Sequence, residues 1–249
     1  MNGVPGNLPA LPARDRAVLV GALAGLAVLS WAYLWFVPMP MPGPGGAVGG
    51  GSYATLTFLM WSVMMLGMML PSVTPTVLLF ARVNRRDAAR EAGGRTATFV
   101  LGYLLVWLAF SAAATALQIG LLRAGWIDAM GVLTARHLTA ALLAGIGLYQ
   151  WLPLKATCLE HCQSPVQFLV AAYRPGRRGA LWMGARHGLY CLGCCWARML
   201  LLFAGGVMNL LWVAALAALV FLEKLAGAGR SWRLASGAAA LVAAAILMS

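Results

Sequence analysis

The chain has 249 residues, of which 62% are hydrophobic and 10% charged, and its formal net charge at pH 7 is +12. A soluble globule of this length has too little interior to bury so much apolar surface, so the composition excludes an ordinary soluble domain and favours an integral membrane protein. The basic residues lie in short segments between apolar stretches, which is typical of topology signals and argues against a nucleic-acid-binding surface.

Apolar stretches follow one another along the chain, each near the roughly 20 residues that cross about 30 Å of hydrocarbon. In chain order the seven stretches are residues 17–37, 53–83, 96–122, 137–154, 180–203, 205–222 and 232–249. Pro71 and Pro75 are expected to kink or break the second stretch. The sequence therefore predicts an all-α, polytopic bundle of about seven transmembrane helices that forms a single domain over residues 1–249.

The distribution of Lys and Arg predicts the orientation of this bundle. With a cytoplasmic N-terminus, fourteen of the eighteen basic residues fall in inside segments, while Arg123 and Arg136 lie outside. Arg186 and Arg198 fall near the two ends of the fifth stretch, where long side chains can reach the lipid headgroups. We therefore expect a multi-pass protein of the cell inner, or plasma, membrane with its N-terminus in the cytoplasm.

Sulfur-bearing and imidazole side chains share one face of the predicted fifth helix. At about 100° per residue, His187, Cys191 and Cys194 fall within a sector of about 60°, with Cys195 at its edge. A lone cysteine is most often a small packing residue in a tight helix. Three cysteines within five residues, one turn from a histidine, favour ligand or redox chemistry instead, because an unpartnered imidazole is costly in hydrocarbon.

A second group of candidate ligands precedes this helix on the predicted cytoplasmic side. Cys158 and Cys162 share a helical face, His161 is adjacent, and Pro153 and Pro165 bracket the segment. Thiolate and imidazole suit copper(I) and zinc, and a reducing cytosol would keep these thiols free. His161 is the less certain ligand of the three, since it could instead cap the helix or contact headgroups.

Methionines form a stripe on the predicted second helix. Met60, Met64 and Met68 repeat every four residues, and Met65 and Met69 flank them. A methionine stripe is more often flexible core packing, but thioether sulfur also selects copper(I) over harder ions. The stripe is expected at about the depth of Cys191 to Cys195, so Met64 and Met68 are candidate ligands of the same site.

Together these motifs resemble the bacterial family of predicted metal-binding integral membrane proteins, grouped as a domain of unknown function. The resemblance covers about residues 53–224. The matching residues are Trp61, Met64, Met65, Met68, Met69, Pro71, Ser72, Gly147 to Gln150, Pro153 to Lys155, Cys158 to Cys162, Gly188 to Cys191, Gly193 to Trp196, Gly206 to Asn209, Glu223 and Lys224. It implies that Met64, Met68 and all five cysteines belong to a shared metal site. Arg198 departs from the apolar residue that the family pattern implies there.

The preferred hypothesis is a membrane protein that binds a soft metal, copper(I) before zinc, for handling or transfer. Its expected ligands are Cys158, His161, Cys162, His187, Cys191, Cys194, Cys195, Met64 and Met68. We expect no catalytic residue and no organic cofactor; the expected partners are lipid, the metal ion and an unidentified membrane or metallochaperone protein, without nucleic acid. Two alternatives stay open. Cys191 and Cys194 form a CxxC that would suit an enzymatic thiol-disulfide relay, and the chain could be a scaffold subunit of a membrane complex.

Overall fold

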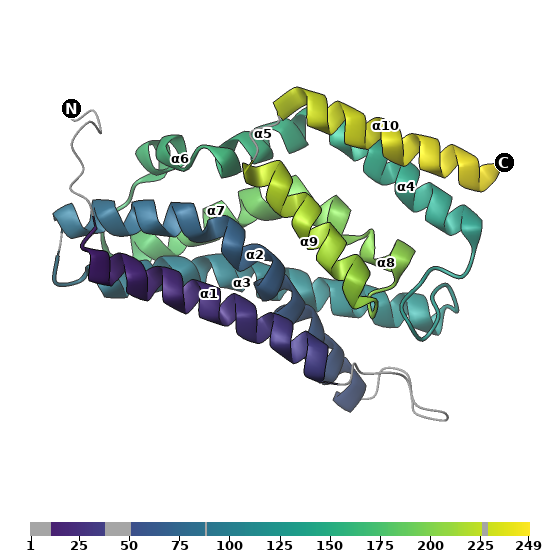
Figure 1. Cartoon of the computed structure of the whole chain (residues 1–249), viewed down its shortest axis with the longest axis horizontal. Helices are drawn as coiled ribbons and strands as arrows, with labels where there is room; N and C mark the ends of the chain where they lie inside the picture. Colours follow the sequence, from purple (N-terminus) through teal and green to yellow (C-terminus); the bar gives the residue numbers. More distant parts are fainter. Residues whose placement is uncertain (1–10, 38–50, 88, 226–228) are drawn as a thin grey trace.

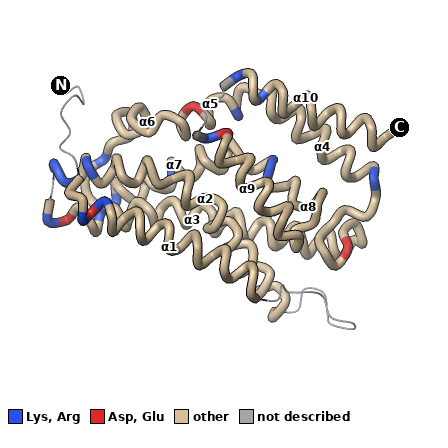
Figure 2. Tube along the Cα trace, in the orientation of Figure 1, with Lys and Arg blue, Asp and Glu red and all other residues tan. Residues whose placement is uncertain are grey.

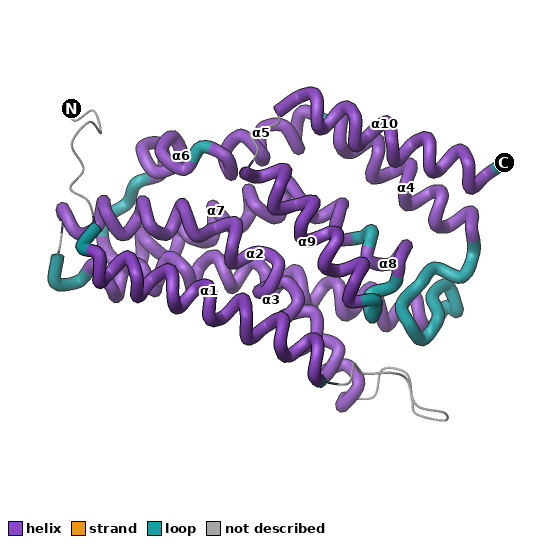
Figure 3. The backbone as a smooth tube through the Cα atoms, viewed as in Figure 1, coloured by secondary structure: helices purple, strands orange, loops and turns teal. Residues whose placement is uncertain are grey.

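The computed structural model describes residues 11–37, 51–87, 89–225 and 229–249, and their regular structure is helical apart from one isolated bridge between Ile127 and Leu133 (Figures 1 and 3). The all-α prediction is therefore confirmed. The helices are α1 (Ala13–Phe36), α2 (Gly51–Asp87), α3 (Ala92–Arg123), α4 (Arg136–Trp151), α5 (Pro153–Gln163), α6 (Pro165–Ala172), α7 (Gly176–Met199), α8 (Leu202–Gly205), α9 (Leu210–Leu225) and α10 (Gly229–Met248).

Among the described residues, five helical segments are long and apolar enough to cross a membrane, which is fewer than the seven predicted. They are Ala13–Phe36, Gly51–Arg86, Ala92–Arg123, Gly176–Gly205 and Arg230–Met248. The fourth and sixth apolar stretches instead form α4 and α9, which have 16 residues each. Pro153 and Pro165 are the first residues of α5 and α6, so proline divides the segment after α4 into short helices. The count of spanning helices was overestimated because apolar composition does not fix helix length.

Helix α2 continues through both of its prolines. It contains Pro71 and Pro75 within 37 residues of unbroken helix, so the expected break is absent there. Figure 1 shows that α2 changes direction along its length, as expected where proline removes a backbone donor and its ring crowds the preceding turn. This one helix contacts α1, α3, α6 and α9.

Helices α3 and α7 pack backbone against backbone. A Cβ atom added to Gly184 would lie 1.9 Å from the carbonyl oxygen of Phe99, and one added to Gly102 would lie 2.2 Å from that of Leu181. Small residues allow such an approach, and in lipid close packing replaces the hydrophobic effect as the source of helix association. These glycines therefore fix the position of α7 against the bundle.

Charged and apolar side chains are segregated over the molecule. Figure 2 shows Lys and Arg gathered at one end of the long helices and around the junction of α5, the end of α9 and the start of α10. Large apolar side chains elsewhere face outward; Phe36 is 80% exposed and Leu211 81%. An apolar exterior over helices of spanning length is consistent with a membrane protein.

Candidate metal centre

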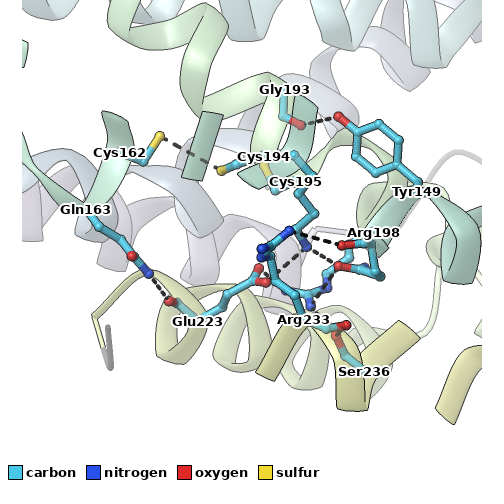
Figure 4. A network of polar contacts seen from close by, with 12 residues as sticks. Tyr149, Cys162, Gln163, Gly193, Cys194, Cys195, Arg198, Glu223, Arg233 and Ser236 are labelled. Carbon is cyan, nitrogen blue, oxygen red and sulfur yellow. Dashed lines mark hydrogen bonds and ion pairs between the residues drawn. The ribbon is translucent and has the colours of Figure 1, made fainter. Parts of the chain in front are cut away.

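Cysteines from α5 and α7 meet where the two helices pack together. The Sγ atoms of Cys162 and Cys194 are 3.9 Å apart (Figure 4). Gly193 allows this approach, because a Cβ atom there would lie 2.6 Å from the Sγ of Cys158. All five cysteines carry free thiols, and we call Cys158, Cys162, Cys191, Cys194 and Cys195 the thiol centre.

The α7 cysteines point in different directions. The thiols of Cys194 and Cys195 donate hydrogen bonds to the carbonyl oxygen of Cys191 at 3.1 and 3.0 Å. The Cys191 sulfur lies 3.1 Å from the hydroxyl of Tyr103 and 2.9 Å from the ammonium nitrogen of Lys224. Four of the five cysteines are buried, and Cys162 is the half-buried one. Cys162 is therefore the least buried residue of this centre.

Lys224, near the end of α9, connects the thiol centre to α2. Its ammonium lies 3.5 Å from the thioether sulfur of Met69 and 3.3 Å from the hydroxyl of Ser72, in addition to the contact with Cys191. Side chains from α2, α3, α7 and α9 thus converge on one point in the interior. Met69, which flanks the predicted methionine stripe, reaches this point, and the prediction that Met64 and Met68 are ligands stays a prediction.

A buried ion-pair network lies beside the thiol centre (Figure 4). One carboxylate oxygen of Glu223 accepts a hydrogen bond from the guanidinium of Arg198. Its other carboxylate oxygen is 3.0 Å from the ammonium nitrogen of Lys155. The amide oxygen of Gln150 accepts from both Lys155 and Arg198, and Arg198 also donates to Ser236 at 3.1 Å. The network joins α4, α5, α7, α9 and α10. A buried pair adds little net stability over apolar packing, yet removing one partner is costly.

Arg198 is therefore not an interfacial side chain. It is 1% exposed, and its guanidinium contacts the Glu223 carboxylate inside the protein. The expectation that it reaches the lipid headgroups was wrong, because a buried carboxylate from α9 supplies its partner. The same pair accounts for a charged residue at a position where the family resemblance implied an apolar one.

The pKa values of the two α5 thiols are raised. Burial raises the pKa of the Cys158 thiol. Hydrogen bonds with the thiols of Cys191 and Cys194, together with burial, raise the pKa of Cys162 well above its usual value. Since a metal binds the thiolate, coordination by either residue would release a proton.

The predicted histidine ligands have contacts other than hydrogen bonds to thiols among the described residues. His187 is buried among the rings of Phe99, Tyr103 and Phe168, and its Nδ1 has no hydrogen-bond partner. The Nδ1 of His161 lies 2.8 Å from the carbonyl oxygen of Thr157, and its ring stacks on Tyr190 with centroids 4.3 Å apart. In the described part of the chain neither imidazole hydrogen-bonds to a thiol, although both are close in sequence to a cysteine.

The side chains of the described residues are not arranged as a complete metal site. Among them, no group of three or more His, Cys, Asp and Glu side chains is placed to hold an ion. The Cys162 and Cys194 sulfurs nevertheless have a suitable spacing. Two thiolates about 2.3 Å from one ion, the zinc-thiolate distance, lie about 3.8 Å apart in a tetrahedral site and up to about 4.6 Å apart when the ion is between them. The arrangement thus supplies a two-thiol pair with Cys191 as a neighbouring third thiol.

Comparison with known proteins gives one family. A family model described as PpoB2, copper chaperone, matches residues 58–247. The match begins within α2 and includes the thiol centre, Met69, Lys224 and the whole ion-pair network. No curated protein and no solved structure matches the chain.

Proposed function

The chain belongs to the PpoB2 copper chaperone family, and on this premise we propose that it is an integral membrane protein that takes up copper(I) at the thiol centre and passes it to a partner protein. The observation that carries the proposal is the 3.9 Å separation of the Cys162 and Cys194 sulfurs, which come from two different helices. Copper is the cargo of such a protein and not a resident cofactor. The predicted cytoplasmic N-terminus remains part of this proposal.

Cys162 and Cys194 are the proposed primary ligands, and Cys191 is the proposed third. Their sulfurs are soft donors, which favour copper(I) over harder ions. The thioether of Met69 is linked to this group through its contact with Lys224, which in turn contacts Cys191. Zinc prefers four ligands and rarely uses methionine, so a site of two or three thiols beside a thioether suits copper(I) better. Met64, Met68, His161 and His187 remain sequence-based candidates for the outer parts of the site.

Transfer would pass through Cys162. It is the half-buried thiol of the centre, whereas Cys194 and Cys191 are 1% and 2% exposed. A thiol of a donor or acceptor protein can displace one ligand at a time when one ligand of the bound ion is accessible. Copper would therefore arrive at and leave from the α5 side of the pair.

Metal analysis of purified protein tests this function. Protein purified anaerobically in detergent is loaded with copper(I), and bound copper and free thiols are measured on the same samples. We expect stoichiometric copper in the wild type and its loss in Cys162→Ser/Cys194→Ser. The comparison variant is Cys195→Ser, whose hydroxyl can keep the hydrogen bond to the carbonyl of Cys191; copper retained in this variant would separate the proposed primary ligands from the rest of the thiol centre. Full copper content in the double variant would refute the proposed ligands.

The same 3.9 Å separation favours a second candidate function, a thiol-disulfide relay. The pair that spans two helices is Cys162 and Cys194, not the CxxC pair of Cys191 and Cys194 within α7. Metal-free protein with two of its five thiols in a reducible disulfide would support the relay over copper binding. Metal-free protein with all five thiols reduced would favour the scaffold alternative.

A further inference from the structure

Buried positive charge exceeds buried negative charge around the thiol centre. Lys155, Arg198 and Lys224 are buried cations, and Glu223 is the buried carboxylate among them. Glu223 is engaged by Arg198 and Lys155. Within the described chain, Lys224 forms no ion pair with a carboxylate; its ammonium contacts two sulfurs and a hydroxyl.

A buried ammonium needs a negative partner. Removing an ion from water costs several kcal/mol in a real protein unless an opposite charge and hydrogen bonds compensate. The C-terminal end of α9 supplies a partial charge of about −0.5 from the helix dipole, which compensates only in part. The nearest group that can carry a full negative charge is the Cys191 thiol, 2.9 Å away.

Copper(I) bound by thiolates supplies such an anion. One monovalent ion with two thiolates has a net charge of −1, since +1 − 2 = −1, and with three thiolates it has −2. A divalent ion with the same ligands is more positive by one unit, so its two-thiolate complex is neutral. A fixed ammonium beside the sulfurs therefore favours the monovalent ion.

We infer that Lys224 is the counter-cation of the thiol centre and makes it selective for a soft monovalent ion held as an anionic thiolate complex. Lys224 is a positioning residue in this scheme and acts through Cys191 without binding the metal. The inference rests on the proposed function and adds the origin of its ion selectivity. Met69 and Ser72 hold the ammonium on the side of α2, so it stays beside the sulfur.

Charge variants at position 224 test this inference. Lys224→Met removes the charge and keeps the length of the side chain, Lys224→Gln removes the charge and keeps polar contacts, and Lys224→Arg keeps the charge. Affinity for copper(I) is measured by anaerobic competition with a chromophoric copper(I) chelator, and affinity for zinc(II) with a zinc chelator. We expect both neutral variants to lose about 10- to 100-fold in copper(I) affinity, the range for residues that support metal ligands. Lys224→Arg should stay within a few-fold of the wild type.

Selectivity separates an electrostatic role from a merely structural one. We expect the neutral variants to lose much less affinity for zinc(II) than for copper(I), whereas a distorted site would lose both. Equal losses for the two ions would overturn the inference, as would unchanged or increased copper(I) affinity in both neutral variants. If the wild type binds copper(I) through its thiols and the variants match it, the inference alone fails. If the wild type binds no copper(I), the proposed function fails as well.

Discussion

The two faces of α7 make different contributions: one packs the helix against α3, and the other carries polar contacts to α5 and α9. Toward α3 the helix presents glycine, and the backbones touch without intervening side chains. Toward α5 and α9 it presents Cys194 and Arg198, which meet a thiol and a carboxylate from other helices. The glycine contacts of the first face fix the height and rotation of the helix, and Cys191 and His187 also reach Tyr103 of α3. We conclude that the packed face positions the thiols, and that the polar face gives them their chemistry.

The largest effect is expected from breaking the packed face. In Gly184→Ala the new methyl group would meet the Phe99 carbonyl oxygen at 1.9 Å, and backbone cannot move aside as a side chain can. We expect a loss of at least about 3 kcal/mol in stability, at the upper end for overpacked sites. Thermal unfolding in detergent measures it. The control is Gly25→Ala on α1, which meets open space and should change stability by no more than about 1 kcal/mol. Equal unfolding temperatures of Gly184→Ala and Gly25→Ala would contradict the close backbone packing of α7 against α3.

The next largest effect is expected from the charges on the polar face. Glu223→Gln leaves Arg198 and Lys155 without their carboxylate in the interior, which costs about 3 kcal/mol for a broken buried pair. The matched control is Glu91→Gln, which removes the Arg95 partner at a site where the glutamate side chain is 56% exposed. Such a pair is worth at most about 1 kcal/mol. Similar unfolding temperatures for the two variants would show that the network does not hold the polar face together.

The smallest effect is expected from the methionines. Met69→Leu keeps the volume of the side chain, so the fold should tolerate it at a cost below about 1.5 kcal/mol. Its sulfur contacts Lys224, and we expect copper(I) affinity to fall a few-fold in this variant. Met64→Leu and Met68→Leu are measured beside it and test the prediction that these residues bind copper. A larger loss of copper(I) affinity in Met64→Leu or Met68→Leu than in Met69→Leu would assign the thioether ligand to that residue instead of Met69.

The helical class and the grouping of cysteines on helix faces could be predicted from the sequence, because both depend on local patterns. Hydrophobic composition predicted the helices, and the i, i+4 spacing placed Cys158 and Cys162 on one face of α5. A shared face gives a direction but no distance, so it did not show that His187 lies among aromatic rings. Its position depends on α3 and α6, which no local pattern of α7 reveals.

The charged part of the site was harder to predict from the sequence. A Glu-Lys pair at the end of an apolar stretch has the appearance of an interfacial stop, yet Glu223 and Lys224 are both buried. Their burial follows from where α9 ends, beside α5 and α7, and this depends on how short helices pack. Arg198 gave a signal, since a charge where an apolar residue is expected needs a partner, but the sequence did not identify Glu223 as that partner.

X-ray absorption at the copper edge is the most direct test of copper binding at the thiol centre. We predict that the loaded wild-type protein contains copper(I) with sulfur neighbours only, about two or three of them, and that Cys162→Ser/Cys194→Ser loses this signal. A first shell of nitrogen or oxygen, copper(II), or an unchanged sulfur shell in the double variant would contradict the account.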